Sequence, residues 1–247
     1  EFFPVTHSIP GAIGVAFWTS KGYIVYASEF IIDFGAPEGF RCDLQKMMEI
    51  GKKGVLILLV ESSYAKKDGY TSPKHKLTKL IEPTFEEATG RIIISSYAQN
   101  VFRTKEIVEL TKKYHRRIVF YGRDKYDHTN SILRLGKKMR KPVIQVDNHI
   151  LGKKENIGNP VKDRNYVILL SGSPQNIYSD IDDILDGGDE LLKIGKGDTF
   201  IVASPVLPGT EKIANRADNN LYRTDANIVL LKNKVLLSMN ASNEDIK

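Results

Sequence analysis

Small hydroxyl and glycine residues follow four apolar runs of this chain, a position at which such residues can bind a ligand. Each run with its polar end occupies residues 92–96, 118–122, 167–173 and 200–204. Uninterrupted runs rich in Val and Ile, separated by helical stretches, predict strands buried on both faces of a parallel sheet. Ligands of such sheets bind beyond the carboxyl ends of the strands, where helix N-termini offer unpaired N–H groups to anions. The sequence therefore predicts a phosphate-binding edge.

The candidate phosphate- or RNA-binding residues lie in the loops after these runs and at the starts of the following helices. They are Ser95, Ser96, Asn100, Arg103, Gly122, Arg123, Ser171, Gly172, Ser173, Ser204 and Gly209. Glycine lets the backbone approach a ligand, hydroxyls add donors, and an arginine can hold a phosphate through two parallel hydrogen bonds. The alternative is that these residues only form strand-to-helix turns and helix N-caps.

Composition indicates a folded protein with an anionic partner. The 247 residues are 41% hydrophobic and 27% charged, which suffices for one large domain or two modest ones. A net charge of +6 with a pI near 9.1 favours partners that carry phosphate. The lone Cys42 excludes an internal disulfide, and the lack of a signal sequence or membrane-spanning stretch predicts a cytoplasmic protein. Because residue 1 is not Met and strand-like sequence follows at once, we expect a segment of a longer protein.

Periodicity and turn signals predict two compartments. The first has a hairpin over residues 12–28, a helix over 43–50, a buried strand over Val55–Val60 and a helix beginning at Ser72-Pro73, which Pro83 limits or kinks. The second alternates strands with helices, which predicts right-handed βαβ units and a doubly wound sheet. Its expected helices cover residues 101–114, 130–139, 180–185 and 211–222, and its expected loop covers 152–164.

Two basic runs belong to the same compartment, at residues 112–117 and 135–141. Such runs are usually solvated helix ends, where cations complement the helix dipole. The other interpretation is a distributed track for RNA.

Eight phrases of the sequence, in order along nearly the whole chain, carry a family resemblance. They are THSIP, GVLILLVESS, GYTSP, GRIIISSYAQNVFR, VFYGRD, LLSGSPQN, GDTFIVASPVLPG and the NxLYR that ends at Arg223. Together they resemble ribonuclease J, a member of the metallo-β-lactamase superfamily with an inserted β-CASP domain.

The resemblance implies an α/β fold: a partial metallo-β-lactamase αββα layer plus a doubly wound parallel-sheet β-CASP domain. Residues 1–70 would form the metallo-β-lactamase part, residues 71–225 the β-CASP domain, and residues 226–247 the return to the first domain. Members of the family use two metal ions, usually zinc, to cleave RNA internally and from the 5′ end. The resemblance also implies recognition of the 5′ phosphate of RNA by β-CASP loops.

At the metal positions that the resemblance implies, this chain is altered. His7 stands where the family has a metal-binding histidine, Glu29 where it has an aspartate, Glu61 at a further acidic position, and Asn240 where a histidine is expected. An amide is a poor zinc ligand and no general acid. The family's HxHxDH cluster is absent from these residues. His7 and Glu29 remain the candidate metal ligands, and we expect the chain as given to bind no zinc and to cleave no RNA unaided.

The leading hypothesis is therefore an RNA-binding β-CASP region of a ribonuclease J-like RNA-processing protein, either a degenerate paralogue or a fragment, without activity as an isolated chain. A homo-oligomer or an active paralogous subunit is the expected protein partner. The first alternative is an active zinc-dependent endo- and 5′-3′ exoribonuclease whose HxHxDH lies upstream. The second is a doubly wound nucleotide-binding or oligomerisation module, although neither GxGxxG nor GxxxxGK[ST] follows any strand.

Overall fold

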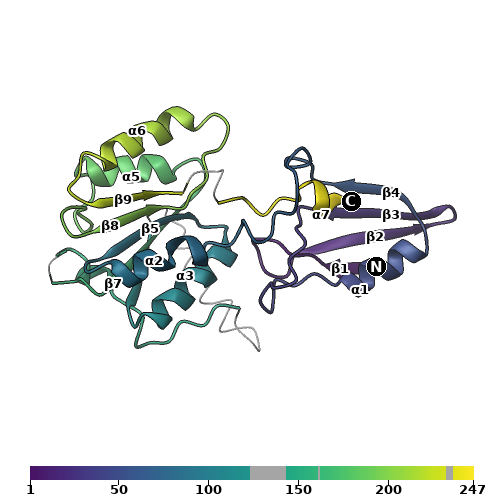
Figure 1. The fold of residues 1–247 in the computed structure, drawn as a ribbon, viewed down its shortest axis with the longest axis horizontal. Coiled ribbons are helices and arrows are strands. Elements are labelled where there is room, and N and C mark those ends of the chain that lie inside the picture. Colours follow the sequence, from purple (N-terminus) through teal and green to yellow (C-terminus); the bar gives the residue numbers. More distant parts are fainter. Residues whose placement is uncertain (123–142, 161, 232–235) are drawn as a thin grey trace. The chain divides into compact units, whose positions relative to one another are not determined.

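The computed structural model describes residues 1–122, 143–160, 162–231 and 236–247, which form two compact units (Figure 1). Unit 1 comprises Glu1–Lys76 with Leu237–Lys247, and unit 2 comprises Leu77–Leu236. The domain boundaries expected at residues 70 and 225 stay predictions; the chain crosses between the compact units after Lys76 and after Leu236. Within the described residues, no helix is long and apolar enough to cross a membrane.

Unit 1 contains a four-stranded mixed sheet with one covering helix. Its strands, in spatial order, are β1 (Phe2–Pro4), β2 (Ile13–Thr19), β3 (Gly22–Ser28) and β4 (Val55–Val60). The first three are antiparallel and β4 pairs with β3 in parallel. Helix α1 (Leu44–Lys52) follows Asp43, whose carboxylate accepts the Lys46 N–H at 2.9 Å as an N-cap. The hairpin and the helix expected here are both confirmed, and the short α7 (Asn243–Ile246) ends the chain.

The prediction that Val55–Val60 forms a buried strand is wrong in its burial. The strand is present as β4, but its first five side chains are 42–52% exposed. An apolar run specifies a strand that is suited to burial, whereas burial itself requires layers over both faces. Among the described residues of unit 1, β4 pairs with β3 alone, and of its side chains only Val60 packs, partly buried, against the apolar cluster under the sheet.

The helix expected at Ser72-Pro73 begins later than predicted, because a different residue supplies its cap. Helix α2 (Thr78–Glu87) starts where the Leu77 and Thr78 N–H groups donate to the Glu106 carboxylate at 3.0 and 3.1 Å. The helix passes through Pro83 and continues to Glu87. A carboxylate that lies 28 residues away along the chain is a cap that local sequence cannot reveal.

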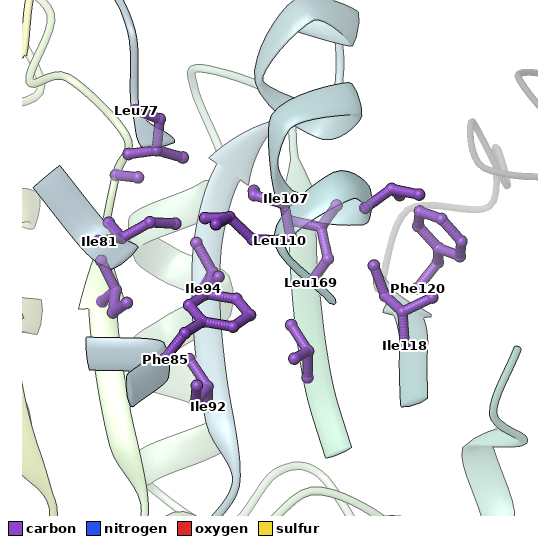
Figure 2. Packing of buried hydrophobic residues seen from close by; sticks show 14 of the residues in the cluster. Leu77, Ile81, Phe85, Ile92, Ile94, Ile107, Leu110, Ile118, Phe120 and Leu169 are labelled. Atoms are coloured by element: carbon purple, nitrogen blue, oxygen red, sulfur yellow. The ribbon is translucent and has the colours of Figure 1, made fainter. Parts of the chain in front are cut away.

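Unit 2 contains five parallel strands between two helix layers. The spatial order is β6 (Arg117–Tyr121), β7 (Tyr166–Gly172), β5 (Ile92–Tyr97), β8 (Thr199–Val202) and β9 (Asn227–Leu230). Side chains of α2 and α3 (Val101–Lys113) pack with Ile92 and Ile94 on one face, as Figure 2 shows. Side chains of α5 (Ile177–Leu185) and α6 (Glu211–Leu221) pack with Ile93 on the other. The predicted doubly wound parallel sheet is confirmed.

The element boundaries in unit 2 differ from the expected ones by small amounts. Helix α5 begins three residues before the predicted Asp180, and the loop over 152–164 includes a short 3₁₀ helix, η1 (Lys154–Asn156). The predicted helix over 130–139 and the basic run over 135–141 lie outside the described residues. Strand β9 begins at Asn227, so this part of the expected return segment belongs to the sheet of unit 2.

A buried ion pair joins the amino ends of β5 and β8. The Arg91 guanidinium donates to both carboxylate oxygens of Asp198, at 2.8 Å from Nε and 2.6 Å from Nη2, and both side chains are fully buried. The remaining guanidinium donors bind the carbonyls of Ile157 and Lys193. Because every charge has partners, the pair fixes two neighbouring strands at their starts, and losing one member would leave the other buried and uncompensated.

We expect Arg91→Met to lower the free energy of unfolding by about 3–5 kcal/mol, because it leaves the Asp198 carboxylate unpaired in the interior. Urea denaturation followed by far-UV circular dichroism measures the change. Asp186→Asn is the matched control, since its ion pair with Arg216, at 3.4 Å between exposed side chains, should be worth less than about 1 kcal/mol. Equal losses in the two variants would contradict the assignment.

Candidate nucleic-acid interface and candidate metal positions

Strand register brings the predicted hydroxyl residues to one edge of the sheet in unit 2. Ser96 pairs with Ser171, and Tyr97 pairs with Gly172, at the carboxyl ends of β5 and β7. On the other side of β5, the Ala203 N–H donates to the Ser95 carbonyl at 3.0 Å, which places Ser204 directly beyond the end of β8. The chain leaves β5 for β6 and later returns to the opposite side of β5 as β8, so this edge contains the switch point of the sheet.

The hydroxyls at this edge lie on both faces of the sheet. Because side chains alternate along a strand, Ser96 and Ser171 follow the α2 and α3 side of the sheet, while Ser95 follows the α5 and α6 side. The hydroxyl oxygens of Ser95, Ser96 and Ser204 are buried and have no hydrogen-bond partner among the described residues. Buried hydroxyls are normally bonded, so these three are candidates for a hydrogen bond to a water molecule or a polar ligand.

Three side chains clamp the backbone that follows β8. The carbonyls of three successive residues, Ala203, Ser204 and Pro205, accept hydrogen bonds from Arg103, Tyr178 and Tyr97 respectively. The donors come from three different elements: α3, α5 and β5. Burial raises the pKa of the Tyr97 hydroxyl to about 12, so this donor keeps its proton at neutral pH. The clamp therefore fixes the loop that carries Ser204.

Arg103 and Asn100 are both used inside the protein. The Asn100 side chain caps α3 by accepting the Arg103 N–H at 3.0 Å. The Arg103 side chain is 1% exposed and donates through Nη1 to the Ala203 carbonyl at 3.0 Å. These contacts position the site, and whether either residue also touches phosphate stays a prediction. The neighbouring Phe102 is buried at 3% exposure and is not available for stacking with bases.

The predicted glycines have steric roles at the same edge. A Cβ at Gly122 would lie 2.7 Å from the Ser171 carbonyl oxygen, so only glycine lets the end of β6 approach β7 this closely. A Cβ at Gly172 would lie 3.2 Å from a carboxylate oxygen of Asp180. Sequence reasoning missed Asp180 as a neighbour of the site, because nothing local shows that α5 turns this carboxylate toward β7.

Two further predicted residues lie in the loops that begin α5 and α6. The Ser173 carbonyl accepts the N–H groups of Asn176 and Ile177 in the turn before α5, at 3.1 and 3.0 Å. The Gly209 N–H donates to the Glu211 carboxylate at 2.8 Å, so a side chain of the protein already occupies this anion position at the start of α6. Arg123 lies outside the described residues.

The basic run over 112–117 lies at the end of α3 and the start of β6, which is the amino edge of the sheet. Lys112 pairs with Asp147 at 3.2 Å, and Lys113 pairs with Glu82 at 2.5 Å. Arg116 is buried and donates to the carbonyls of Ala88 and Gly90. The charges of this run therefore serve internal contacts, which favours the structural interpretation over an RNA track.

Two of the predicted metal-ligand residues in unit 1, His7 and Glu29, contact each other. His7 Nε2 lies 2.8 Å from a Glu29 carboxylate oxygen. The Ile9 N–H donates to His7 Nδ1 at 3.2 Å, so in the neutral ring Nε2 carries the proton and donates it to Glu29. Glu61 accepts the Ser63 N–H within its own turn at 2.5 Å. Asn240 contributes its backbone carbonyl, which accepts a hydrogen bond from the Thr71 hydroxyl at 2.6 Å.

These residues do not fit a zinc centre. A zinc site takes three or four protein ligands, and the described residues contain no group of three His, Cys, Asp or Glu side chains that could hold a metal ion. The imidazole nitrogen that would face a metal instead bonds to Glu29. His7 and Glu29 therefore form a hydrogen-bonded pair, and these residues by themselves do not complete a zinc site.

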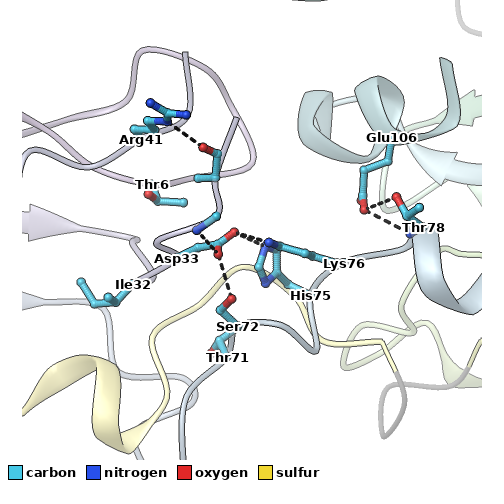
Figure 3. A network of polar contacts seen from close by, with 12 residues as sticks. Thr6, Ile32, Asp33, Arg41, Thr71, Ser72, His75, Lys76, Thr78 and Glu106 are labelled. Atoms are coloured by element: carbon cyan, nitrogen blue, oxygen red, sulfur yellow. Dashed lines mark hydrogen bonds and ion pairs between the residues drawn. The ribbon is translucent and has the colours of Figure 1, made fainter. Parts of the chain in front are cut away.

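Sequence reasoning also missed a buried carboxylate, Asp33, that organises unit 1 (Figure 3). Its Oδ1 accepts the Ser72 hydroxyl at 3.0 Å, and its Oδ2 lies 3.3 Å from His75 Nε2 and 3.1 Å from Lys76 Nζ. Burial by itself would raise the pKa of Asp33, but the hydrogen bonds from Lys76 and Ser72 and the nearby His75 lower it below the ordinary 3.8. The network ties the segment over 71–76 to the turn after Asp33.

Because the pKa of Asp33 is lower in the folded protein, its contribution to stability is present above the ordinary carboxyl range and is lost as pH falls through the folded value. We expect Asp33→Asn to unfold more easily than the wild type at pH 7, with the difference shrinking below about pH 4. Urea midpoints of both proteins at neutral and acidic pH measure it. A difference that stays constant with pH would contradict an ionic role for Asp33.

Comparisons with known proteins identify proteins to which this chain is similar. The model of the ribonuclease J β-CASP domain matches residues 89–221, which include most of unit 2 and its carboxyl edge. Ribonuclease J 2 of Staphylococcus aureus is 29% identical over 252 residues, and Ribonuclease J 2 of Streptococcus pyogenes is 28% identical over 247 residues. Both matches cover the whole chain, which spans 43–44% of the length of these relatives.

Proposed function

The chain belongs to the ribonuclease J β-CASP family, and from that premise we propose that unit 2 binds RNA at the carboxyl edge of its sheet, by a phosphate group, as part of RNA processing. The observation that carries the proposal is the set of buried hydroxyls without partners, Ser95, Ser96 and Ser204, at the switch point. A phosphate supplies several acceptor oxygens, and one bound on the α5 and α6 side would use the Ser95 hydroxyl together with the loop that carries Ser204.

The electrostatics of the edge support an anion over a neutral ligand. Helix α3 directs its N-terminus toward this edge, and helix N-termini carry partial positive charge. The buried Arg103 adds a full positive charge beside the Ser204 loop. The net charge of +6 strengthens attraction to a polyanion at low salt. Recognition of a 5′-terminal phosphate is the specific form that we propose.

The proposal for this chain is binding without hydrolysis. His7 and Glu29 are paired with each other, and Asn240 cannot act as a general acid, so unit 1 lacks the groups that would activate water. Cleavage would then depend on a metal site supplied from outside these residues, either by an upstream part of the full-length protein or by a partner subunit.

Binding is tested with fluorescent RNA oligonucleotides that carry a 5′ phosphate or a 5′ hydroxyl, using fluorescence anisotropy. We expect tighter binding of the phosphorylated RNA, and affinity that falls as salt rises. The double variant Ser95→Ala/Ser204→Ala should bind at least about a hundredfold more weakly, because it removes two hydrogen bonds to a charged group, each of which contributes about 1.5–3 kcal/mol.

Ser179→Ala is the matched control, since Ser179 is exposed on α5. It should bind RNA like the wild type. Negligible affinity for both RNAs would refute RNA binding, and equal affinity for both would refute recognition of the 5′ phosphate. Affinity unchanged by the double variant would move the site away from this edge.

We expect the purified chain to leave a 5′-labelled RNA intact when zinc or manganese is added. Denaturing gel electrophoresis over several hours measures this, with a chelator-treated sample as control. The reason is the incomplete donor set around His7. Degradation that requires the metal and stops with chelator would support the alternative of an active ribonuclease.

A further inference from the structure

A groove with a volume of about 580 Å³ runs along α6 on the surface of unit 2, where α6 lies beside α5 (Figure 1). We call it the α6 groove. Cationic and amide side chains line most of it: Lys212, Asn215, Arg216, Asn219, Asn220 and Arg223. Asp186, just after α5, is the acidic member of the lining. The last three residues of that list belong to the NxLYR phrase of the sequence, which has no part in the proposed phosphate site.

The cations of the α6 groove exceed its acids. Arg216 lies 3.2 Å from the Asp182 carboxylate and 3.4 Å from the Asp186 carboxylate, so its charge is balanced inside the protein. Lys212 and Arg223 are both exposed, and neither pairs with a carboxylate among the described residues. The groove therefore keeps two uncompensated positive charges, which attract an anionic ligand.

Two of the three asparagines in the groove are open to a ligand as well. Asn220 is used internally, because it donates to Asp182 at 2.9 Å and accepts from Arg223 at 3.2 Å. Asn215 and Asn219 are exposed, and their side chains make no hydrogen bond within the part of the chain that the structure describes. Each carboxamide offers two donors and an acceptor oxygen, so the groove can bind groups that donate as well as groups that accept.

An exposed aromatic ring extends this surface. Asn215, Asn219 and Tyr222 are spaced by four and three residues, and this spacing places them on one face of a helix. Tyr222 keeps a helical backbone at the end of α6 and is 61% exposed. Nucleic-acid bases stack on exposed aromatic rings of this kind whatever their sequence.

The α6 groove starts near the carboxyl edge of the sheet and leads away from it. Helix α6 begins after the loop that follows the carboxyl end of β8, so Lys212 in its first turn lies at that end of the unit. Arg223 follows the last turn, shortly before β9 begins at the amino edge. At a rise of about 1.5 Å per residue, the helix separates these two positions by about 16 Å.

We propose that the α6 groove binds the body of a single-stranded RNA, beyond a 5′ end held at the carboxyl edge, an inference that rests on the proposed function of unit 2. Lys212 and Arg223 would contact phosphates. Asn215 and Asn219 suit ribose hydroxyls and base edges, which both donate and accept hydrogen bonds, and Tyr222 suits the face of a base. These contacts do not select one RNA sequence.

An acidic peptide fits the α6 groove less well than RNA. Its carboxylates only accept hydrogen bonds, so they would bind the cations and offer no donor to the acceptor oxygens of Asn215 and Asn219. They also present no ring to stack on Tyr222. RNA matches the charges, the amides and the aromatic ring together.

The test is fluorescence anisotropy of the full chain with long single-stranded RNA that carries a 5′ phosphate or a 5′ hydroxyl. Lys212→Gln/Arg223→Gln should bind both RNAs about tenfold more weakly at low salt. The slope of log affinity against log salt should fall by about 0.7 for each lost phosphate contact. Tyr222→Ala should also weaken binding about tenfold, and Tyr222→Phe, which keeps a ring, should recover most of that loss.

Lys193→Gln/Lys196→Gln is the matched control, because it removes two exposed positive charges from unit 2 outside the α6 groove. Its affinity should stay within about twofold of the wild type, since screening by salt limits the effect of charges far from the RNA. Circular dichroism checks that all variants are folded. Equal weakening by this control and by Lys212→Gln/Arg223→Gln would overturn the inference.

The preference for a 5′ phosphate separates this inference from the proposed function. The groove variants should weaken both RNAs by the same factor and keep the preference, whereas Ser95→Ala/Ser204→Ala should reduce the preference. Unchanged affinity of the groove variants for RNA that the wild type binds would overturn the groove and leave the carboxyl-edge site standing. Weakening by the groove variants without any 5′ preference in the wild type would support the groove and refute 5′-phosphate recognition. A polyglutamate peptide that competes as well as RNA does would overturn the choice of RNA as the ligand.

Discussion

The parallel pairing of β5 with a neighbour on each side is the constraint on which the rest of unit 2 depends. Because β7 and β8 both run parallel to β5, the residues that end all three strands must meet at one edge. Burial on both faces by two helix layers makes a shift of register costly, since a shift by one residue would turn every side chain to the opposite face. The Arg91–Asp198 pair fixes the starts of β5 and β8, and so fixes where they end.

The polar groups at that edge fall into two sets: side chains that hold a loop through internal hydrogen bonds, and hydroxyls that have no partner among the described residues. Arg103, Tyr97 and Tyr178 are committed to three successive carbonyls, and the residues they hold include Ser204. A rigid loop keeps a hydroxyl in place without a ligand, which lowers the entropic cost of binding. Arg103, which was a candidate phosphate ligand by its chemistry, supports the Ser204 loop from inside the protein. The hydroxyls of Ser95, Ser96 and Ser204 have no partner among the described residues.

In unit 1, several ionisable side chains pair with one another, whereas several apolar side chains are exposed. His7 and Glu29 bond to each other, and Asp33 gathers Ser72, His75 and Lys76 around one carboxylate. By contrast, apolar side chains of its sheet such as Phe17, Tyr26 and Ile57 are exposed.

The sequence alone determined the strand and helix types, the doubly wound sheet and the family, because these follow from local periodicity and from motifs in order. It placed Ser95, Ser96 and Ser204 at strand ends correctly for the same reason. Only the tertiary structure decided that Arg103 and Phe102 are buried, that Glu106 starts α2, and that β4 is exposed. Burial and capping depend on residues that are distant along the chain. An apolar run indicates that a strand can pack against other apolar side chains, but only the arrangement of layers determines whether its faces are covered.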